Sequence, residues 1–338
     1  MNADTSSTPP AANAASTSGG FPRLLGDVGG TNARFALQET AGAPPSQIVT
    51  YRGADYPTFA DAILKYLSQV TGPKPVQGAI GIANPIVGDH VQMTNSTWSF
   101  SIEDIRVKAA FSRFLVVNDF TALALSLPGL EPQHIRQIGG GSADATAAIG
   151  LIGAGTGLGV SGLLRIDGGR RSVPLGGEGG HVSLAPDNAR EDAVVAALRA
   201  KFGHVSAERA LSGSGLVNLY EALCGLDGVQ AKALDPAGVS AAAMDGSDAH
   251  AVEAVDMFFA FMGSVAGNLA LTLGARGGLY IGGGIAPRLG DWIERSQFRE
   301  RFVAKGRFRA YLDAIPTWLI HADVSPALIG AARALDSL

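Results

Sequence analysis

The chain has 338 residues, of which 46% are hydrophobic and 17% charged, a composition typical of a globular protein long enough for two domains. Its formal net charge of -4 argues against a surface that binds nucleic acid or an anionic membrane, because such surfaces need clustered Lys and Arg. The single cysteine, Cys224, excludes an internal disulfide and a multi-cysteine zinc site, and it indicates the reducing cytoplasm.

The first 20 residues are small and polar and contain prolines. They have neither the basic start nor the apolar centre of a secretory signal. Their low hydrophobicity gives them too little apolar surface to form a core. We therefore predict a disordered tail over residues 1–20.

The first predicted elements belong to a pattern that occurs twice, as LLGDVGGTNARFAL at residues 24–37 and as LIGAGTGLGVSGLL at residues 151–164. In both copies short apolar runs flank a glycine turn, which predicts strand, turn and strand. Backbone amides in such turns form a concavity that suits anions, and Thr31 and Thr156 add hydroxyl donors. The glycines that we expect to adopt positive φ and to let a ligand approach the amides are Gly29, Gly30, Gly155 and Gly157. The repeat predicts a site for nucleotide phosphates, held from two sides.

The sequence around these turns argues against two other phosphate-binding motifs. Residues 157–162 match the dinucleotide fingerprint G-x-G-x-x-G, but that signature requires a helix to begin within the glycines. The next segment, LLRIDGGRR, predicts a strand and a turn, so we interpret the match as accidental. The sequence contains no G-x-x-x-x-G-K-[ST], which argues against a P-loop protein. The remaining alternative is two unrelated hairpin turns.

Along the rest of the chain, apolar runs alternate with helical patterns. The predicted strands are GAIGIANP, FLVVND, AAIGLIGAG and GGLYIGGG. The predicted helices cover residues 57–71, 188–202, 208–224 and 250–275. This alternation predicts α/β layers with mixed sheets.

A turn-rich stretch at residues 132–146 separates two cores, and we expect the domain boundary near Gly129. The predicted small α/β domain comprises residues 21–129 plus 316–338, and the predicted large α/β domain comprises residues 130–315.

The segment from Met257 to Ala275 has 19 residues without a charge, which is long enough to cross a bilayer. Glycine, serine and asparagine interrupt it, and Glu253 and Asp256 stand just upstream. The pattern typical of a membrane span, with Lys or Arg flanks and aromatic belts at both ends, does not accompany it. We predict a buried helix of the larger domain rather than a membrane span.

Candidate reacting groups stand where the strand FLVVND gives way to a helical pattern. Asn118 and Asp119 occupy the carboxyl end of this strand, where side chains are exposed to a ligand. The alternative is that Asp119 only caps the helix.

Further polar candidates lie in turn segments. Glu178 and His181 stand three residues apart among glycines, and polar residues on such loops tend to meet ligands. The alternative for His181 is a structural imidazole. Glu208 lies near the N-terminus of a predicted helix, where the dipole favours a carboxylate whatever its function. Asn95 lies in MTNSTW, where turn chemistry explains it equally well. Together these amides, carboxylates and imidazole suit a polyhydroxylated ligand.

Seven motifs, in order, resemble those of the bacterial glucokinases, which belong to the superfamily of hexokinases, actin and the heat-shock ATPases. The motifs are GDVGGTNARFAL, MTNSTWSFS, VVNDFTALALSLP, GAGTGLGVSGL, PLGGEGGHVSLAP, ERALSGSGL and GGLYIGGGIAPR. The resemblance runs from about Arg23 to the end of the chain. It implies a two-domain actin-like ATPase (ribonuclease H-like) fold, with mixed sheets flanked by helices and an interdomain cleft.

The resemblance also implies roles for individual residues. Asp119 matches the family's catalytic base, and Asp27 matches an acidic residue expected to hold magnesium through water. The positions that match sugar contacts are Asn95, Asn118, Asp119, Glu178, His181 and Glu208. The positions that match the nucleotide loops are Asp27, Gly29, Gly30, Thr31, Asn32, Gly155, Thr156, Gly157, Gly282, Gly283 and Gly284. For the last three glycines the alternative is a packed turn.

The activity implied by the resemblance is ATP-dependent phosphorylation of D-glucose at the 6-hydroxyl, the first step of glycolysis. ATP and magnesium would be the cofactors, and a homodimer the assembly. Enzyme alternatives are a kinase for another hexose or amino sugar and a polyphosphate-using glucokinase. A sugar-responsive regulator needs a DNA-binding helix pair, for which the 20-residue leader is short and carries no basic run. A filament or chaperone ATPase has no use for the loop with Glu178 and His181.

Overall fold

The computed structural model describes residues 19–93, 96–321 and 326–338, so most of the predicted tail and Asn95 lie outside the described residues. The strands are β1 (Arg23–Val28), β2 (Asn32–Gln38), β3 (Ser46–Arg52), β4 (Gln77–Ile82), β5 (His90–Gln92), β6 (Ser99–Ser101), β7 (Arg113–Asn118), β8 (Ile135–Gly139), β9 (Ile149–Ala154), β10 (Leu158–Ile166), β11 (Arg171–Leu175), β12 (Leu279–Gly282) and β13 (Thr317–Ile320). The helices are α1 (Phe59–Gln69), α2 (Ile102–Lys108), α3 (Asp119–Ser126), α4 (Ala189–Phe202), α5 (Gly213–Leu226), α6 (Pro236–Met244), α7 (Ala249–Leu273), α8 (Ile285–Arg288), α9 (Trp292–Arg295), α10 (Phe298–Val303), α11 (Arg309–Asp313) and α12 (Pro326–Ser337).

The two large sheets have the same topology. The first has the strand order β3-β2-β1-β4-β7, and the second has β11-β10-β9-β12-β13, with β8 added at the far edge. In each sheet the first three strands are antiparallel neighbours, and the next two run parallel to the third. The sequence repeat is therefore a repeat of the whole sheet, with one glycine turn in each copy.

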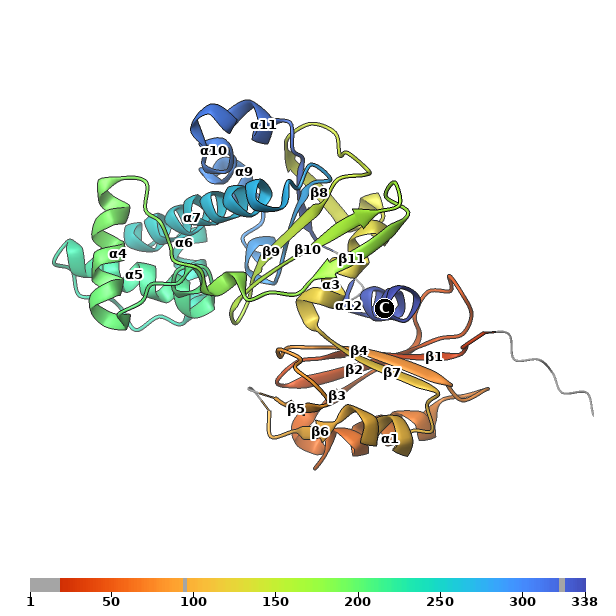
Figure 1. Ribbon diagram of the computed structural model, residues 1–338. Helices are drawn as coiled ribbons and strands as arrows, with labels where there is room; N and C mark the ends of the chain where they lie inside the picture. The colour runs from red at the N-terminus through yellow and green to blue at the C-terminus, as the bar shows by residue number, and fades with distance from the viewer. Residues whose placement is uncertain (1–18, 94–95, 322–325) are drawn as a thin grey trace, which may run out of the picture.

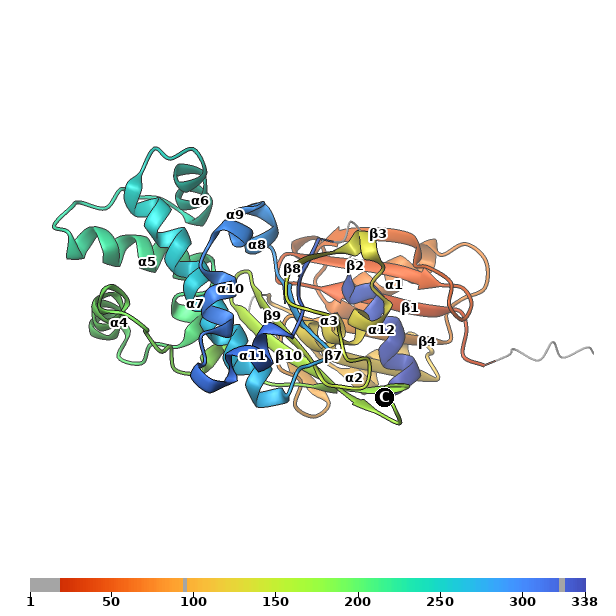
Figure 2. The ribbon, with the colours of Figure 1, turned by 90° about the horizontal axis from the view of Figure 1, so that it is seen from above.

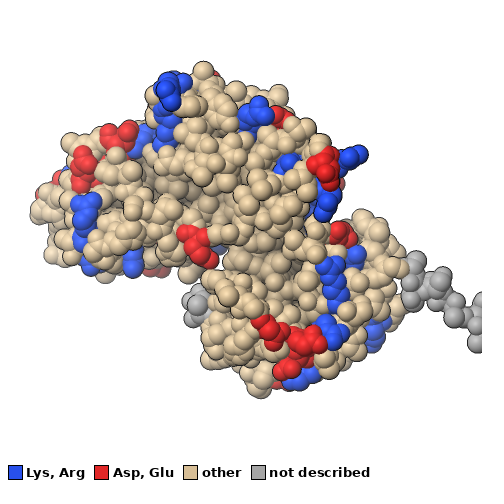
Figure 3. Space-filling model, in the orientation of Figure 1, with Lys and Arg blue, Asp and Glu red and all other residues tan. Residues whose placement is uncertain are grey.

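Helices α3 and α12 lie between the two sheets, while α1 and α7 cover the outer faces (Figures 1 and 2). Successive strand residues point to opposite faces, so Leu24 of β1 packs into the core with α1 and Leu25 into the core with α12. Similarly, Leu151 of β9 packs with α3 and α12, and Ile152 packs with α7. Acidic and basic side chains are interspersed over the face drawn in Figure 3, which is hollowed between the two sheets.

The structure confirms the predicted fold class and both strand-turn-strand units. It also confirms that no helix begins within residues 157–162, because β10 runs through them. Helix α7 is long and apolar enough to cross a bilayer, but 78% of its most apolar 18-residue window is buried inside the protein, as expected for a core helix.

The predicted helix over residues 208–224 begins later than expected. Ser212 caps α5 by accepting a hydrogen bond from the Gly215 amide, and the helix starts at Gly213. Glu208 instead lies in a separate 3-10 turn, Ala207–Arg209. A second difference concerns the end of the chain. Strand β13 pairs with β12 and β8 in the second sheet, and only α12 packs against the first.

Candidate active site

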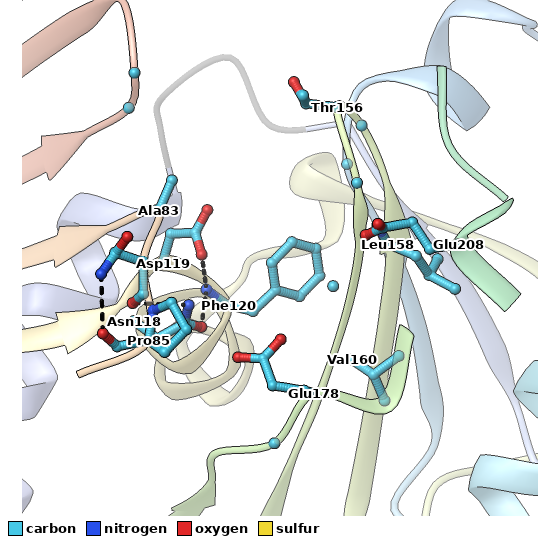
Figure 4. Close-up of a pocket in the computed structure, with 18 of the residues that line it drawn as sticks. Ala83, Pro85, Asn118, Asp119, Phe120, Thr156, Leu158, Val160, Glu178 and Glu208 are labelled. Atoms are coloured by element: carbon cyan, nitrogen blue, oxygen red, sulfur yellow. Dashed lines mark hydrogen bonds between the residues drawn. The ribbon is translucent and has the colours of Figure 1, made fainter. Parts of the chain in front are cut away.

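A cavity of about 790 Å³ lies between the two sheets, at the ends where both glycine turns face each other (Figure 4). Its lining residues come from both halves of the molecule and are Gly29, Gly30, Thr31, Ala83, Asn84, Pro85, Asn118, Asp119, Phe120, Gly155, Thr156, Gly157, Leu158, Gly159, Val160, Gly177, Glu178, Glu208 and Gly283. The structure thus brings most of the residues singled out from the sequence to one place.

The junction of β7 and α3 forms one wall. Asn118 is the N-cap of α3, and its side-chain oxygen accepts hydrogen bonds from the amides of Phe120 at 2.9 Å and Thr121 at 3.2 Å. The capping role that the sequence left open for Asp119 therefore belongs to Asn118. Asp119 is the first residue of the helix, and its carboxylate also accepts from the Phe120 amide, at 2.9 Å.

The surroundings of the Asp119 carboxyl change its pKa. Burial raises the pKa of Asp119 from its ordinary value of 3.8 to about 6. The negative charges of Asp27 and Glu178 contribute to this rise in pKa, and the hydrogen bond from the Phe120 amide opposes it. A carboxylate of this kind is ionised at neutral pH and still basic enough to accept a proton from a hydroxyl group.

The two glycine turns form the opposite walls. Within them, the Gly29 amide donates to the Asn32 carbonyl at 2.9 Å, and the Gly155 amide donates to the Gly157 carbonyl at 2.8 Å. The expectation of positive φ at Gly29, Gly30, Gly155 and Gly157 is wrong, because none of the four is among the glycines with positive φ. These short hairpins close without a left-handed residue, so the glycines leave room beside the backbone rather than supply an unusual conformation.

Two carboxylates face the cavity from the larger half. Glu178 precedes a 3-10 turn, Gly179–His181, and Figure 4 shows its side chain directed into the cavity. His181, the last residue of that turn, is exposed and is not among the residues that line the cavity. Glu208 lines the cavity and accepts a hydrogen bond from the Leu158 amide at 2.8 Å.

The remaining predicted residues do not line the cavity, except for Gly283, and Asn95 lies outside the described residues. Asp27, in β1, is close enough to Asp119 to raise the pKa of that residue. Asn32 begins β2 directly after the first turn. Gly282 ends β12, and Gly283 and Gly284 follow it; of these three glycines, only Gly283 lines the cavity. Its φ is +77°, and an added Cβ would lie 2.3 Å from the Ala154 carbonyl oxygen, so this turn is packed as well as exposed to the cavity.

Several lining residues were missed by the sequence analysis. They are Ala83, Asn84, Pro85, Phe120, Leu158, Gly159, Val160 and Gly177. The Asn-Pro pair after β4 carried a usable signal, since β4 runs parallel to β7 with Ile82 opposite Asn118, and parallel strands end at the same sheet edge. The side-chain amide of Asn118 donates a hydrogen bond to the backbone carbonyl of Asn84 at 3.4 Å. Phe120 could not be foreseen, because its ring occupies the space left by Gly159, 39 residues further along the chain.

The described side chains that could bind a metal ion near the cavity are few. Within residues 19–93, 96–321 and 326–338, no group of three or more His, Cys, Asp or Glu side chains is arranged to hold a metal ion. Magnesium, however, needs only one or two protein carboxylates when phosphates and water supply its other ligands. Asp27 beside the first glycine turn fits that requirement.

A family model described as glucokinase matches residues 24–338. The chain belongs to the glucokinase family. It is 52% identical to a glucokinase of Aromatoleum aromaticum, over 94% of this chain and 95% of the relative, and 55% identical to a glucokinase of Chromobacterium violaceum, over 93% and 89%. It is also 53% identical to a "Bifunctional protein glk" of Burkholderia pseudomallei, of which it spans half the length. These relationships identify an ATP-dependent hexose phosphotransferase, a glucokinase.

The solved structures agree with this assignment. The glucokinase of an Antarctic psychrotroph superposes with a TM-score of 0.87 at 38% identity, covering 93% of this chain and 98% of that one. A ROK family glucokinase from Streptomyces griseus, solved with glucose and AMPPNP, shares the fold at a TM-score of 0.59 and 19% identity, covering 92% and 98%. The actin-like ATPase fold expected from the sequence is therefore confirmed.

Proposed function

We propose that the cavity between the two sheets is where this glucokinase transfers the γ-phosphoryl group of ATP to the 6-hydroxyl of D-glucose, with Asp119 as the base. The observation that carries this proposal is the position of the Asp119 carboxylate, with its pKa of about 6, in one cavity with both glycine turns. The related glucokinases solved with glucose, and with glucose and AMPPNP, support the choice of substrates.

Asp119 accepts the proton of the sugar hydroxyl as that oxygen attacks the γ-phosphorus in line. Its carboxylate is held by the Phe120 amide at the start of α3, so it enters the reaction already oriented. Asn118 fixes the helix start by capping it. Glu178, His181, Glu208 and Asn95 bind the remaining sugar hydroxyls, which positions the 6-hydroxyl at Asp119.

The phosphates are held by the backbone amides of the two glycine turns, residues 29–31 and 155–157, and by the hydroxyls of Thr31 and Thr156. Gly282, Gly283 and Gly284 form the adenosine side. Asp27 would hold magnesium through water, and that ion would neutralise phosphate charge when it is bound with ATP.

We propose a small domain of residues 21–129 plus 316–338 and a large domain of residues 130–315. Strand β13, which lies in the returning segment 316–338, pairs in the second sheet. Because the cavity is lined from both sheets, closure of one half on the other would expel water and limit ATP hydrolysis without sugar. We further propose that the enzyme is a cytoplasmic homodimer, an assembly that sedimentation equilibrium measures directly.

The test of the proposed function is the substitution Asp119→Asn, which keeps the size of the side chain and removes the base. Turnover is expected to fall at least about a hundredfold, while glucose binding by calorimetry changes little. Asp104→Asn serves as the matched control, because Asp104 is exposed in the first turn of α2, away from the cavity. Near-normal turnover of Asp119→Asn would refute the assignment of the base. A panel of hexoses and amino sugars, with ATP or polyphosphate as donor, distinguishes the remaining kinase alternatives.

A further inference from the structure

Glu208 connects two parts of the cavity that bind different substrates under the proposed function. Its carboxylate lines the cavity, and one of its oxygens, Oε2, accepts a hydrogen bond from the Leu158 amide at 2.8 Å. Leu158 directly follows the second glycine turn and begins β10. A side chain assigned to the sugar is thus bonded to the backbone of the phosphate turn (Figure 4).

The segment that carries Glu208 holds the same turn at a second point. The Gly213 amide, at the start of α5, donates to the Gly155 carbonyl at 2.9 Å. Between the two contacts, the Ser212 hydroxyl donates to the Glu208 carbonyl at 2.9 Å. The phosphate turn is therefore fastened at its first glycine by a backbone bond and at its far end by the Glu208 carboxylate.

The contact between the Glu208 carboxylate and the turn depends on the lack of a side chain at Gly157. A Cβ at Gly157 would lie 2.5 Å from Glu208 Oε2, a contact that a shift of the flexible Glu208 side chain would relieve most easily. A Cβ at Gly155, two residues earlier in the same turn, would meet no atom within 4 Å among the described residues. The turn and the carboxylate therefore fit together at Gly157 and are independent at Gly155.

We propose that Glu208 is a positioning residue that couples sugar binding to nucleotide binding. A sugar hydroxyl that donates to Glu208 restrains the carboxylate in the orientation that holds the Leu158 amide, and this orders the turn for the phosphates. By thermodynamic linkage, a nucleotide that orders the turn strengthens sugar binding by the same factor. The proposal rests on the proposed function, in which Glu208 contacts the sugar and residues 155–157 contact the phosphates.

The first experiment measures the binding of a non-hydrolysable ATP analogue by calorimetry in the absence of sugar. Glu208→Ala removes the acceptor and is expected to weaken this binding about tenfold, the effect of a lost charge-assisted hydrogen bond. Glu208→Gln keeps an oxygen acceptor for the Leu158 amide and is expected to stay within about threefold of the wild type. Glu178→Ala is the matched control, because it removes a carboxylate from the same cavity. The Glu178 side chain makes no capping hydrogen bond to the turn that follows it, Gly179–His181.

The second experiment runs in the opposite direction and measures glucose binding without nucleotide. Gly157→Ala is expected to weaken glucose binding about tenfold by displacing Glu208, whereas Gly155→Ala leaves it within about twofold. Thermal melting of all variants checks that the fold is intact.

The outcomes separate the coupling from the proposed function. Unchanged analogue binding in Glu208→Ala, together with weakened glucose binding, would overturn the coupling and leave the sugar site standing. Equal effects of Gly157→Ala and Gly155→Ala on glucose binding would also overturn it. Unchanged glucose binding in both Glu208→Ala and Glu178→Ala would contradict the proposed sugar site itself.

Discussion

Replacing the buried acid Asp119 by asparagine should make the protein more stable at neutral pH, at the cost of activity. A carboxyl group whose pKa rises from 3.8 to about 6 on folding disfavours the folded state at pH 7 by about 3 kcal/mol. Below pH 3.8 the group is neutral in both the folded and the unfolded state and costs no stability. As the pH rises from 3.8 the unfolded state loses the proton first, so the destabilisation grows and is complete above about pH 6. The asparagine oxygen can still accept the hydrogen bond from the Phe120 amide, so the substitution removes mainly the charge.

The assay is urea denaturation of the wild type and Asp119→Asn, without ligands, at two pH values. The variant should be more stable by about 1–3 kcal/mol at pH 7, the lower figure allowing for the lost attraction between the carboxylate and the α3 dipole. At pH 5 the difference should fall to roughly half. Asp104→Asn, on the exposed side of α2, should show no such pH-dependent gain. A variant that is less stable than the wild type at pH 7, or a gain independent of pH, would refute the account of a desolvated carboxylate.

Three further predictions concern the acid limb, sugar affinity and a buried ion pair. The kcat/KM for sugar should decline as the pH falls through about 6, because Asp119 must be ionised to act as the base; a flat profile from pH 7 to pH 5 in steady-state assays would contradict this. Glu178→Gln should raise the KM for sugar far more than the KM for ATP, and an equal rise in both would count against its sugar-side position. Arg301→Ala should lower the free energy of unfolding by about 3–5 kcal/mol in urea, because it leaves the buried Glu191 carboxylate unpaired; a loss below about 1 kcal/mol would show that the pair is dispensable.

The parts of the fold that could be predicted from the sequence are those encoded by local patterns. The repeated run of apolar residues, glycines and threonine predicts β1-β2 and β9-β10, because strand period and turn chemistry act over a few residues. Strands β3 and β8 were missed because they are partly exposed and carry little apolar signal. Strand β13 has only four residues, too few for a clear period.

Long-range contacts decide the parts of the site that local patterns do not encode. Asn118 and Asp119 were predicted because a strand end and a helix start adjoin in the sequence. The bond between Glu208 and the Leu158 amide joins residues 50 apart, and no spacing rule predicts it. The ring of Phe120 against Gly159 is of the same kind, since it depends on how α3 packs on β10.

The most direct test of the account is a crystal structure of the protein with glucose and a non-hydrolysable ATP analogue bound together. We expect the terminal phosphate between residues 29–31 and residues 155–157, and the glucose 6-hydroxyl within about 3 Å of the Asp119 carboxylate. A nucleotide bound away from both glycine turns, or a sugar whose 6-hydroxyl points away from Asp119, would contradict it.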